Sequence, residues 1–393
     1  MKFPWFDNPE EADARGFYMN SVPGTDLTLV KPKVGKYVWQ FPTDDPYAPD
    51  SELSWRSSLL DGDGNEISGG MVKFLDLSEA PSSPMSTAVT AAMCDGTVLL
   101  TLKEDGSLII RSVWKGTVIL RTRGHHELGN FEPLVLPLIE ERFPRLLDPS
   151  LHPELDIHLE FVSPSARIVV AYNEPEMILV HAKERATHRL LSWDELGDLS
   201  EEIGVRRVGV VEGMAVRTPK ELQVLLSAAE TNGSWDREGI VARDPATGFM
   251  VKIKGDRFRW LHRMITETRY SDVVRICDEE GISSLEALRA NLAEKGLDID
   301  RVPAIEEWFG IYRGRVGEFE EMLEGAKSFV AAWEGGSDSR KEFAAAVKGR
   351  PDAGLLFALM DGKTERTIPK FRKAIVDAKV EGNAWTVIGP EDV

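Results

Sequence analysis

A lysine at the end of an apolar run is the first residue whose position could serve chemistry. Lys103 follows the run VLLTL (residues 98–102) and precedes an Asp-Gly turn, in the stretch TVLLTLKEDGSLIIRSVWKG (residues 97–116). A lysine amine acts as a nucleophile only when it is neutral, so its pKa must fall. An apolar pocket and neighbouring cations both lower the pKa of a lysine. Lys103 is therefore either a solvated hairpin residue or a nucleophile held at the edge of a pocket.

Two lysines in VKIK (residues 251–254) could supply the neighbouring positive charge. Residues two apart in a strand point to the same face, so Lys252 and Lys254 project together. They repel each other unless an anion, such as a nucleotide phosphate, lies between them. Glu160 in DIHLEFVS and Glu238 in DREGIVAR add two carboxylates. Each of these features alone is more often an ordinary exposed residue of a strand or turn.

Short strands are the elements that must position these residues. From residue 36 to about residue 265, apolar or alternating runs are separated by turn residues. Helical segments lie between them, the clearest being PKELQVLLSAAET (219–231). The runs on either side of the Asp-Gly turn read as a hairpin. The pattern predicts an α+β domain built on antiparallel sheets.

After about residue 265 the pattern becomes helical. The segment SSLEALRANLAEKG places Leu285, Leu288 and Leu292 on one helix face and ends in a glycine. Helical spacing continues in VGEFEEMLEGAKSFVAAWEG, KEFAAAVKG, AGLLFALM and PKFRKAIVDAKV. We therefore expect two domains, an α+β domain over residues 1–265 and an all-helical domain over residues 266–393.

Composition limits the classes of function. The 393 residues are 42% hydrophobic and 28% charged, as in an ordinary globular protein. The formal net charge of −18 argues against a broad polyanion-binding surface, but not against a local cationic pocket. Cys94 and Cys277 cannot alone make a disulfide framework or a tetrahedral zinc site. Without a signal-peptide pattern or an apolar run of membrane-spanning length, we expect a cytoplasmic protein with no membrane partner.

The order of the motifs is more informative than any one of them. Lys-x-Asp-Gly at 103–106, Glu160, Glu-Gly at 238–239 and Lys-x-Lys at 252–254 resemble the ordered motifs of the covalent nucleotidyltransferase superfamily, which comprises polynucleotide ligases and mRNA capping enzymes. Within it, the chain is most similar to the RNA ligase 1 family of T-even bacteriophages. The matching segments are KEDGSL (103–108), EFVSPSARIVVAY (160–172), REGIVA (237–242) and VKIKGDRFRWLH (251–262).

The resemblance implies both a fold and an activity. The fold would be an antiparallel-sheet nucleotidyltransferase domain, ATP-grasp-like, followed by an all-helical domain that could recognise RNA. The activity would be that of an ATP-dependent RNA ligase, with Mg²⁺ or alternatively Mn²⁺. Lys103 would take AMP from ATP, AMP would pass to an RNA 5′-phosphate, and an RNA 3′-hydroxyl would then displace it. The enzyme would be a cytoplasmic monomer (in the host cytoplasm if a bacteriophage encodes it), and tRNA repair is one role that the family suggests.

The resemblance also assigns roles to individual residues. Lys103 would be the nucleophile, Glu160 would accept hydrogen bonds from the ribose hydroxyls, and Glu238 would bind the metal ion. Leu102 would present backbone groups to the adenine edge, and Val241 would pack on the adenine face. The remaining assignments are cations: Arg56, Lys73, Lys252 and Lys254 on the nucleotide phosphates, and Arg121 and Arg123, which align with two family lysines, on phosphate or RNA.

Besides the arginines at 121 and 123, two residues depart from the family pattern. Ser57 occupies a position where the family usually has glycine, so the turn after Arg56 is uncertain. Phe258 occupies the position of a family tyrosine and lacks its hydroxyl.

Rival activities remain for such a motif series. A DNA ligase or a capping guanylyltransferase also uses a Lys-x-Asp-Gly lysine, but usually carries an OB-fold barrel where this chain shows helical patterns. A non-catalytic RNA-binding protein has little use for a buried lysine beside two glutamates.

Overall fold

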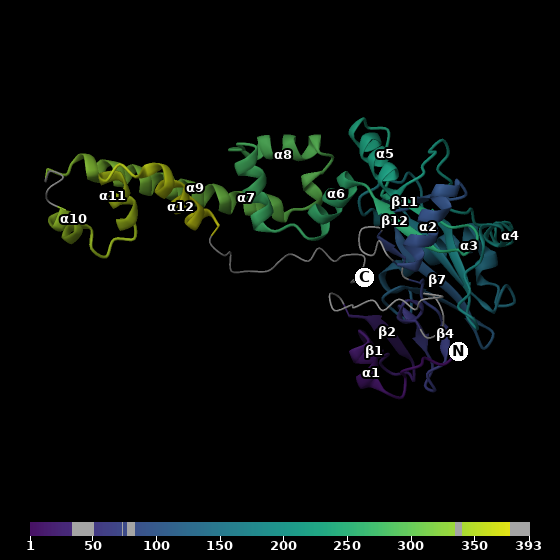
Figure 1. Cartoon of the computed structure of the whole chain (residues 1–393). Coiled ribbons are helices and arrows are strands. Elements are labelled where there is room, and N and C mark those ends of the chain that lie inside the picture. Colours follow the sequence, from purple (N-terminus) through teal and green to yellow (C-terminus); the bar gives the residue numbers. More distant parts are fainter. Residues whose placement is uncertain (34–50, 73, 77–82, 335–339, 378–393) are drawn as a thin grey trace. The chain divides into compact units, whose positions relative to one another are not determined.

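The computed structural model describes residues 1–33, 51–72, 74–76, 83–334 and 340–377 (Figure 1). Of the residues singled out above, Lys73 lies outside the described residues. The chain divides into two compact units, one from Met1 to His262 and one that begins at Arg263. The first unit combines antiparallel sheets with helices, and the second is helical. The predicted fold class is therefore confirmed.

The strands of the described residues form three sheets of four strands each. The N-terminal sheet has the order β1-β2-β3-β4 and is antiparallel throughout. Phe3, Phe17 and Trp55 pack edge to face beside it, close to the helix α1 (Pro9–Ala14). The strands are β1 (Phe17–Ser21), β2 (Thr28–Pro32), β3 (Leu59–Leu60) and β4 (Glu66–Ser68).

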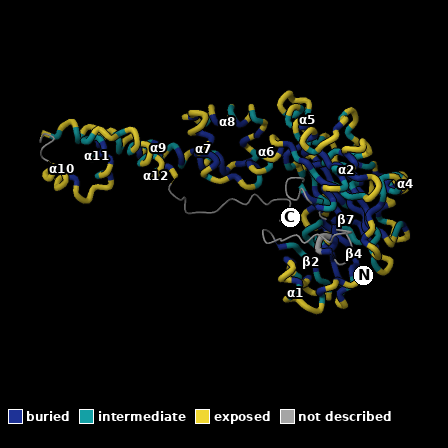
Figure 2. Tube along the Cα trace, in the orientation of Figure 1, coloured by how far each residue is buried: buried dark blue, intermediate teal, exposed yellow. Residues whose placement is uncertain are grey.

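The second sheet has the order β10-β9-β7-β8 and is also antiparallel. Lys115 and Gly116, both at positive φ, join β7 to β8 in a two-residue turn. Apolar residues of two helices, α3 (Glu132–Arg142) and α4 (Trp193–Ile203), form one core with this sheet. The strands are β7 (Ser107–Trp114), β8 (Thr117–Thr122), β9 (Leu155–Val162) and β10 (Glu176–Glu184). β7, β9 and β10 are largely buried, whereas only the last two residues of β8 are (Figure 2).

The third sheet has the order β5-β12-β11-β6, with β5 parallel to β12 and the other pairs antiparallel. Two helices pack on it, α2 (Pro84–Asp95) and α5 (Pro219–Thr231). Each begins with a proline behind a side-chain cap, Ser83 or Thr218, and α5 has the predicted bounds. The strands are β5 (Leu75–Asp76), β6 (Leu99–Lys103), β11 (Gly239–Arg243) and β12 (Met250–Lys254).

The turn after Lys103 connects two sheets, so the predicted hairpin is wrong. β6 pairs with β11 of the third sheet, whereas β7 pairs with β8 and β9 of the second. Gly106 lies so close to β9 that a Cβ atom there would be 2.3 Å from the carbonyl oxygen of Phe161. The Asp-Gly dipeptide therefore serves a crossing between sheets, and glycine is required by close backbone approach.

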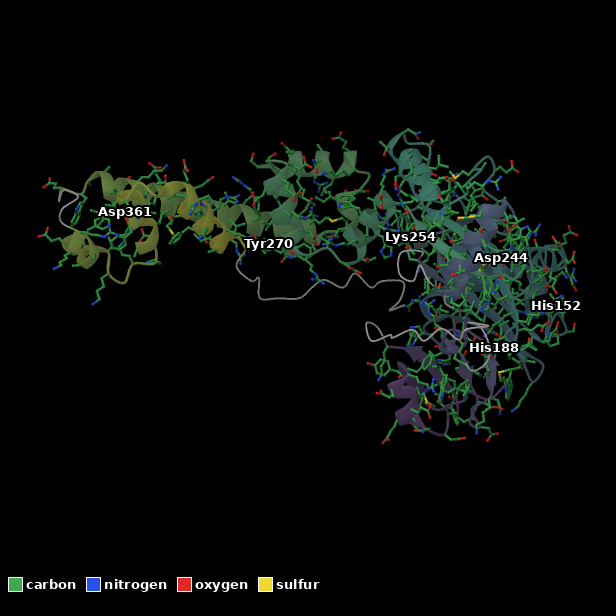
Figure 3. The ribbon with its side chains drawn as sticks, viewed as in Figure 1. His152, His188, Asp244, Lys254, Tyr270 and Asp361 are labelled. Atoms are coloured by element: carbon green, nitrogen blue, oxygen red, sulfur yellow. The ribbon has the colours of Figure 1, made fainter. Side chains whose placement is uncertain are left out.

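The second unit is built from helices, most of them where the sequence predicts them. α9 (Ala304–Ala331) packs against α7, α11 and α12. Tyr270 of α7 is labelled in Figure 3. Its hydroxyl donates to the carbonyl of Val376 at the end of α12, 2.8 Å away. The other helices are α6 (Asp256–Thr266), which begins in the first unit, α7 (Tyr270–Glu279), α8 (Leu285–Glu294), α10 (Arg340–Val347), α11 (Ala353–Met360) and α12 (Thr364–Val376).

Short 3₁₀ helices complete the described elements: η1 (Glu52–Trp55), η2 (Gly129–Phe131), η3 (Pro144–Leu147), η4 (Pro164–Ala166) and η5 (Ile299–Arg301). None of the helices in the described parts of the chain is both long and apolar enough to cross a membrane.

A buried polar cluster joins the N-terminal sheet to the second sheet. Glu66 of β4 accepts from His188 (Nε2–Oε2 2.8 Å) and lies 3.4 Å from Nζ of Lys183 on β10, and all three side chains are fully buried. Asp156 of β9 accepts the N–H of Gly69 at 2.9 Å, just after β4. Buried charges of this kind need partners, so the two sheets are held in one register against each other.

Two buried histidines make the stability of this region depend on pH. The rings of His158 and His181 stack 5.7 Å apart, and burial, with nearby cations, lowers the pKa of His158 to about 3 and that of His181 well below its ordinary value. Both are therefore neutral in the fold, whereas in the unfolded chain they take up protons below about pH 6.5.

We expect the free energy of unfolding to fall as the pH drops from 7 towards 5, since only the unfolded state gains these protons. At pH 5.5 each histidine costs roughly 1 kcal/mol by this linkage. The variant His181→Leu removes one proton site. Its free energy of unfolding, measured with urea, should therefore fall by roughly 1 kcal/mol less than that of the wild-type protein between pH 7 and 5.5. An equal loss in both proteins would contradict the assignment.

Candidate active site

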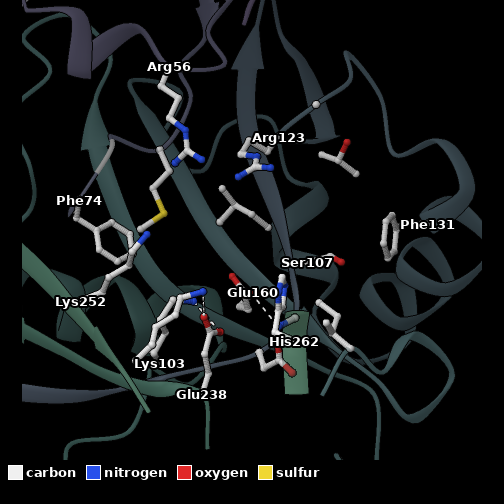
Figure 4. A pocket seen from close by; sticks show the side chains of 18 residues that line it. Arg56, Phe74, Lys103, Ser107, Arg123, Phe131, Glu160, Glu238, Lys252 and His262 are labelled. Atoms are coloured by element: carbon white, nitrogen blue, oxygen red, sulfur yellow. Dashed lines mark hydrogen bonds and ion pairs between the residues drawn. The ribbon is translucent and has the colours of Figure 1, made fainter. Parts of the chain in front are cut away.

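A cavity of about 320 Å³ in the first unit gathers most of the residues that the motifs predicted (Figure 4). They come from separate elements: the ends of β6 and β12, the middle of β9, and the residue before β11. The predicted residues that line it are Arg56, Lys103, Arg123, Glu160, Glu238, Lys252 and Lys254.

The centre of this site is one carboxylate shared by two lysines. Glu238 Oε2 lies 2.7 Å from Nζ of Lys103, and Glu238 Oε1 lies 2.9 Å from Nζ of Lys254. Strand register explains the meeting, because Gly239 of β11 stands opposite both Lys103 of β6 and Lys254 of β12. A Cβ at Gly239 would be 2.2 Å from the carbonyl oxygen of Ile253, so this close pairing requires glycine.

The charges of this group hold Lys103 in its protonated form. Burial alone lowers the pKa of Lys103, but Glu238, Glu160 and Asp105 outweigh it and the pKa lies above its ordinary value. The expected fall in the Lys103 pKa is therefore wrong for the unliganded protein. Lys254 of the same sheet pairs with Glu238 as Lys103 does, but the carboxylates decide the direction of the shift in the Lys103 pKa. Burial likewise raises the pKa of Glu238, yet Lys103 and Lys254 bring it below its ordinary value.

The turn that carries Lys103 is fixed by hydrogen bonds to the segment after β9. Asp105 Oδ2 accepts the N–H groups of Val169 and Val170, both at 2.7 Å. The hydroxyl of Tyr172 accepts the N–H of Asp105 (2.9 Å) and donates to Glu104 (3.0 Å). Sequence reasoning assigned no role to Asp105 or Tyr172, although both lie in the segments that carry the family resemblance. Their spacing from Lys103 and Glu160 was the available signal.

Two further carboxyl groups face the same cavity with raised pKa values. Burial and the charge of Glu238 raise the pKa of Glu160 to about 7, and the same two causes raise that of Asp105 to about 6. Glu160 also accepts the N–H of Gly106 at 3.1 Å. A cation bound beside these carboxyl groups would favour their ionised forms.

The site fits a metal ion that arrives with phosphates better than a preformed metal centre. No group of three or more His, Cys, Asp or Glu side chains within the described ranges is arranged to hold a metal. Mg²⁺ is commonly bound by one or two carboxylates together with substrate phosphates. Glu238 and Glu160 could supply such oxygens, but both oxygens of Glu238 are paired with lysines, so a metal ion would have to displace one.

The predicted phosphate ligands lie on the walls of the cavity. Lys252 Nζ is 5.8 Å from the centre of the Phe74 ring, and Lys254 Nζ is 5.5 Å from that of Phe258. Arg56 and Arg123 line the same cavity from the turn before β3 and the end of β8 (Figure 4). His262 of α6 and Phe131 also line it, and neither was predicted.

The structure does not bring every predicted residue to the cavity. Arg121 is fully buried, and its guanidinium donates to Ser57, Ser68 and Thr122, so the predicted contact with phosphate or RNA does not hold for this residue. The next two residues of the chain, Thr122 and Arg123, line the cavity instead. Leu102 and Val241 are not among the described residues lining the cavity, and the N–H of Leu102 donates to Gly209 at 2.8 Å.

The variant Glu238→Gln tests the electrostatic cause of the raised Lys103 pKa. Removing the carboxylate charge lowers this pKa, so an amine-reactive acylating reagent at pH 8 should label Lys103 about threefold faster or more. Labelling is measured by mass spectrometry of the Lys103 peptide, and the exposed Lys115 is the internal control. Unchanged or slower labelling at Lys103 would show that Glu238 does not hold the proton there.

Comparison with known proteins gives one family match and several distant structural matches. A family model for RNA ligase matches residues 61–258, half of the chain. Among solved structures, a Naegleria gruberi RNA ligase variant with ATP and Mn is 14% identical with a TM-score of 0.38, over 45% of this chain and 55% of that one. An archaeal ATP-dependent RNA ligase is 15% identical with a TM-score of 0.43, over 78% and 79%. The chain spans just over half the length of the Naegleria structures that it matches. On the family match, the chain belongs to the RNA ligase family.

Proposed function

We propose that this protein is an ATP-dependent RNA ligase that works through a lysyl-AMP intermediate on Lys103. One observation carries the proposal: the Lys103 amine lies in the wall of a cavity whose other walls hold Arg56, Arg123, Lys252 and Lys254. A triphosphate bound among these cations meets the amine, and cations placed around phosphoryl oxygens stabilise the charge that develops during transfer.

In the first step Nζ of Lys103 forms a bond to the α-phosphorus of ATP, and the bond from that phosphorus to the bridging oxygen of pyrophosphate breaks. The amine must first give up a proton, and Nζ of Lys103 lies 2.7 Å from Oε2 of Glu238. Glu238 is therefore the nearest acceptor, and Glu160, whose pKa is about 7, is a second group able to exchange protons near neutrality. A divalent metal ion bound with the phosphates would neutralise their charge and lower the pKa of the amine.

The later steps use the same cations. AMP passes from Lys103 to the 5′-phosphate of an RNA strand, and a 3′-hydroxyl then attacks that phosphate and releases AMP. Glu160, acceptor-only when ionised, suits hydroxyl groups of the AMP ribose. Both transfers occur at phosphorus, so Arg56, Lys252 and Lys254 would be required in each.

The helical unit is proposed to recognise RNA, as expected for residues 266–393. On α12, Arg366, Lys370 and Lys373 are exposed at a spacing that places them on one helix face, where they could follow an RNA backbone. The helical unit also stands where a DNA ligase or capping enzyme usually has an OB-fold. A tRNA substrate, the closer kinship with bacteriophage RNA ligase 1, a monomeric state and a cytoplasmic location stay predictions of the resemblance.

The variants Lys103→Ala and Lys103→Arg separate the steps. Neither should accept AMP from ATP, because alanine has no amine and a guanidinium stays charged. Both should fail to seal RNA that carries a 5′-phosphate, yet still seal RNA supplied with a 5′-adenylate. Labelled ATP measures the first step, with labelled GTP as the control against a capping activity. An adduct on either variant would overturn the assignment of the nucleophile.

Alanine at Lys252 or Lys254 should slow lysyl-AMP formation at least tenfold, about 1.4 kcal/mol of transition-state stabilisation. Lys252→Ala is the cleaner variant, because Lys254 also pairs with Glu238. The exposed Lys220 on α5 provides the matched control, Lys220→Ala, which should keep the wild-type rate. Single-turnover adenylylation measures the rates, and a wild-type rate for Lys252→Ala would remove this lysine from the phosphate site.

A further inference from the structure

We propose that Arg121 is a positioning residue of the ligase: it clamps the backbone at Ser57 and thereby holds Arg56 in the cavity. The inference rests on the proposed function, because it assigns Arg56 to the phosphates of a nucleotide. Arg121 itself is fully buried and does not touch the cavity.

The guanidinium of Arg121 crosses from β8 to the N-terminal sheet. Nη2 donates to the carbonyl oxygens of Ser57 (2.7 Å) and Ser68 (3.0 Å), and Nε donates to Oγ of Ser68 (2.7 Å). Nη1 donates to the carbonyl of its neighbour Thr122 at 3.2 Å. A planar fork of donors can satisfy these acceptors at once, whereas a lysine amine is a single point with no such geometry.

The carbonyl held by Arg121 belongs to a residue in an unfavourable conformation. Ser57 has φ +64°, in the left-handed region that glycine adopts freely and other residues rarely do. The backbone at Gly70 packs closely against this turn, since a Cβ at Gly70 would lie 1.8 Å from the carbonyl oxygen of Arg56. Such a conformation persists only where surrounding contacts impose it, and the Arg121 hydrogen bond is one of them.

The residues on both sides of Arg56 are fixed to buried groups. Trp55 is fully buried with its ring edge-on to His188, 4.8 Å between centroids, and the hydroxyl of Ser58 donates to Glu66. Arg56 is the residue of this turn that reaches the cavity (Figure 4). A change in the backbone at Ser57 would therefore first reorient the Arg56 side chain.

The experiment is a double-mutant cycle on single-turnover lysyl-AMP formation. We expect Arg56→Ala and Arg121→Lys each to lower kcat/KM for ATP about tenfold, mostly through KM. If Arg121 acts through Arg56, adding Arg121→Lys to Arg56→Ala should cost less than about twofold more. A further tenfold loss in the double variant would show a general structural role and overturn the proposal, as would a wild-type value for Arg121→Lys.

Glycine at position 57 gives the matched rescue. Ser57→Gly makes the left-handed conformation easy. The double variant Ser57→Gly/Arg121→Lys should therefore be about threefold or more as active as Arg121→Lys alone. Ser57→Ala is the control, because alanine retains the Cβ that disfavours this conformation, and it should recover nothing. Equal rescue by both, or by neither, would contradict the clamp at Ser57. Should Arg121→Lys not fold, Ser68→Ala removes one acceptor of Arg121 and should show a smaller defect that disappears in the Arg56→Ala background.

A readout without catalysis separates this inference from the proposed function. Inorganic pyrophosphate should raise the melting temperature of the wild-type protein, and Arg121→Lys should reduce that shift as much as Arg56→Ala does. If the wild-type protein forms no lysyl-AMP, the proposed function is wrong, and the pyrophosphate shifts still decide the role of Arg121. A full shift in Arg121→Lys beside a lost shift in Arg56→Ala would overturn the inference alone.

Discussion

The carboxylate of Glu238, shared between Lys103 and Lys254, is the interaction on which the site depends. It exists because three neighbouring strands place Gly239 between the two lysines, and because glycine allows the strands to approach. The same carboxylate, with Glu160 and Asp105, raises the pKa of Lys103 and keeps the unliganded amine charged. The resting protein therefore holds its proposed nucleophile in an ion pair. Nucleotide binding would have to bring enough positive charge to separate that pair.

A second constraint lies behind the cavity, in the polar groups buried between the N-terminal sheet and the second sheet. Glu66, Lys183 and His188 form its centre, and Asp156 and Arg121 extend it along β9 and β8. Burying so many polar groups is favourable only if nearly all are paired, which leaves few alternative arrangements of the two sheets. The same contacts border the turn of Arg56. The hydrogen bonds that hold the two sheets together therefore also hold the Arg56 side chain in its orientation at the cavity.

Much of this could be predicted from the sequence, because order along the chain carries the information. Alternating runs and helical spacing predicted the α+β and helical parts, and the motif series predicted membership of the RNA ligase family. The structure then brings Lys103, Glu160, Glu238, Lys252 and Lys254 to one cavity, as the motif order suggested, while their roles stay predictions. Local pattern failed where pairing is non-local: the Asp-Gly turn resembles a hairpin, but β6 pairs with β11, over a hundred residues away in sequence.

Two other errors have electrostatic and geometric causes. The Lys103 pKa was expected to fall because the sequence shows the apolar run and the lysines, but not how close the carboxylates come. Arg121 was grouped with Arg123 because the two align with a pair of family lysines, whereas the structure buries Arg121 and places Arg123 at the cavity. Ser57 and Arg121 both depart from the family pattern, and the structure shows that they contact each other.

The most direct test of the account is the intact mass of the wild-type protein after incubation with ATP and Mg²⁺, followed by peptide mapping. The account predicts a mass increase of one AMP, carried by the peptide that contains Lys103 and lost under acid, as expected for a phosphoramidate. No adduct, or an adduct on another residue, would contradict it.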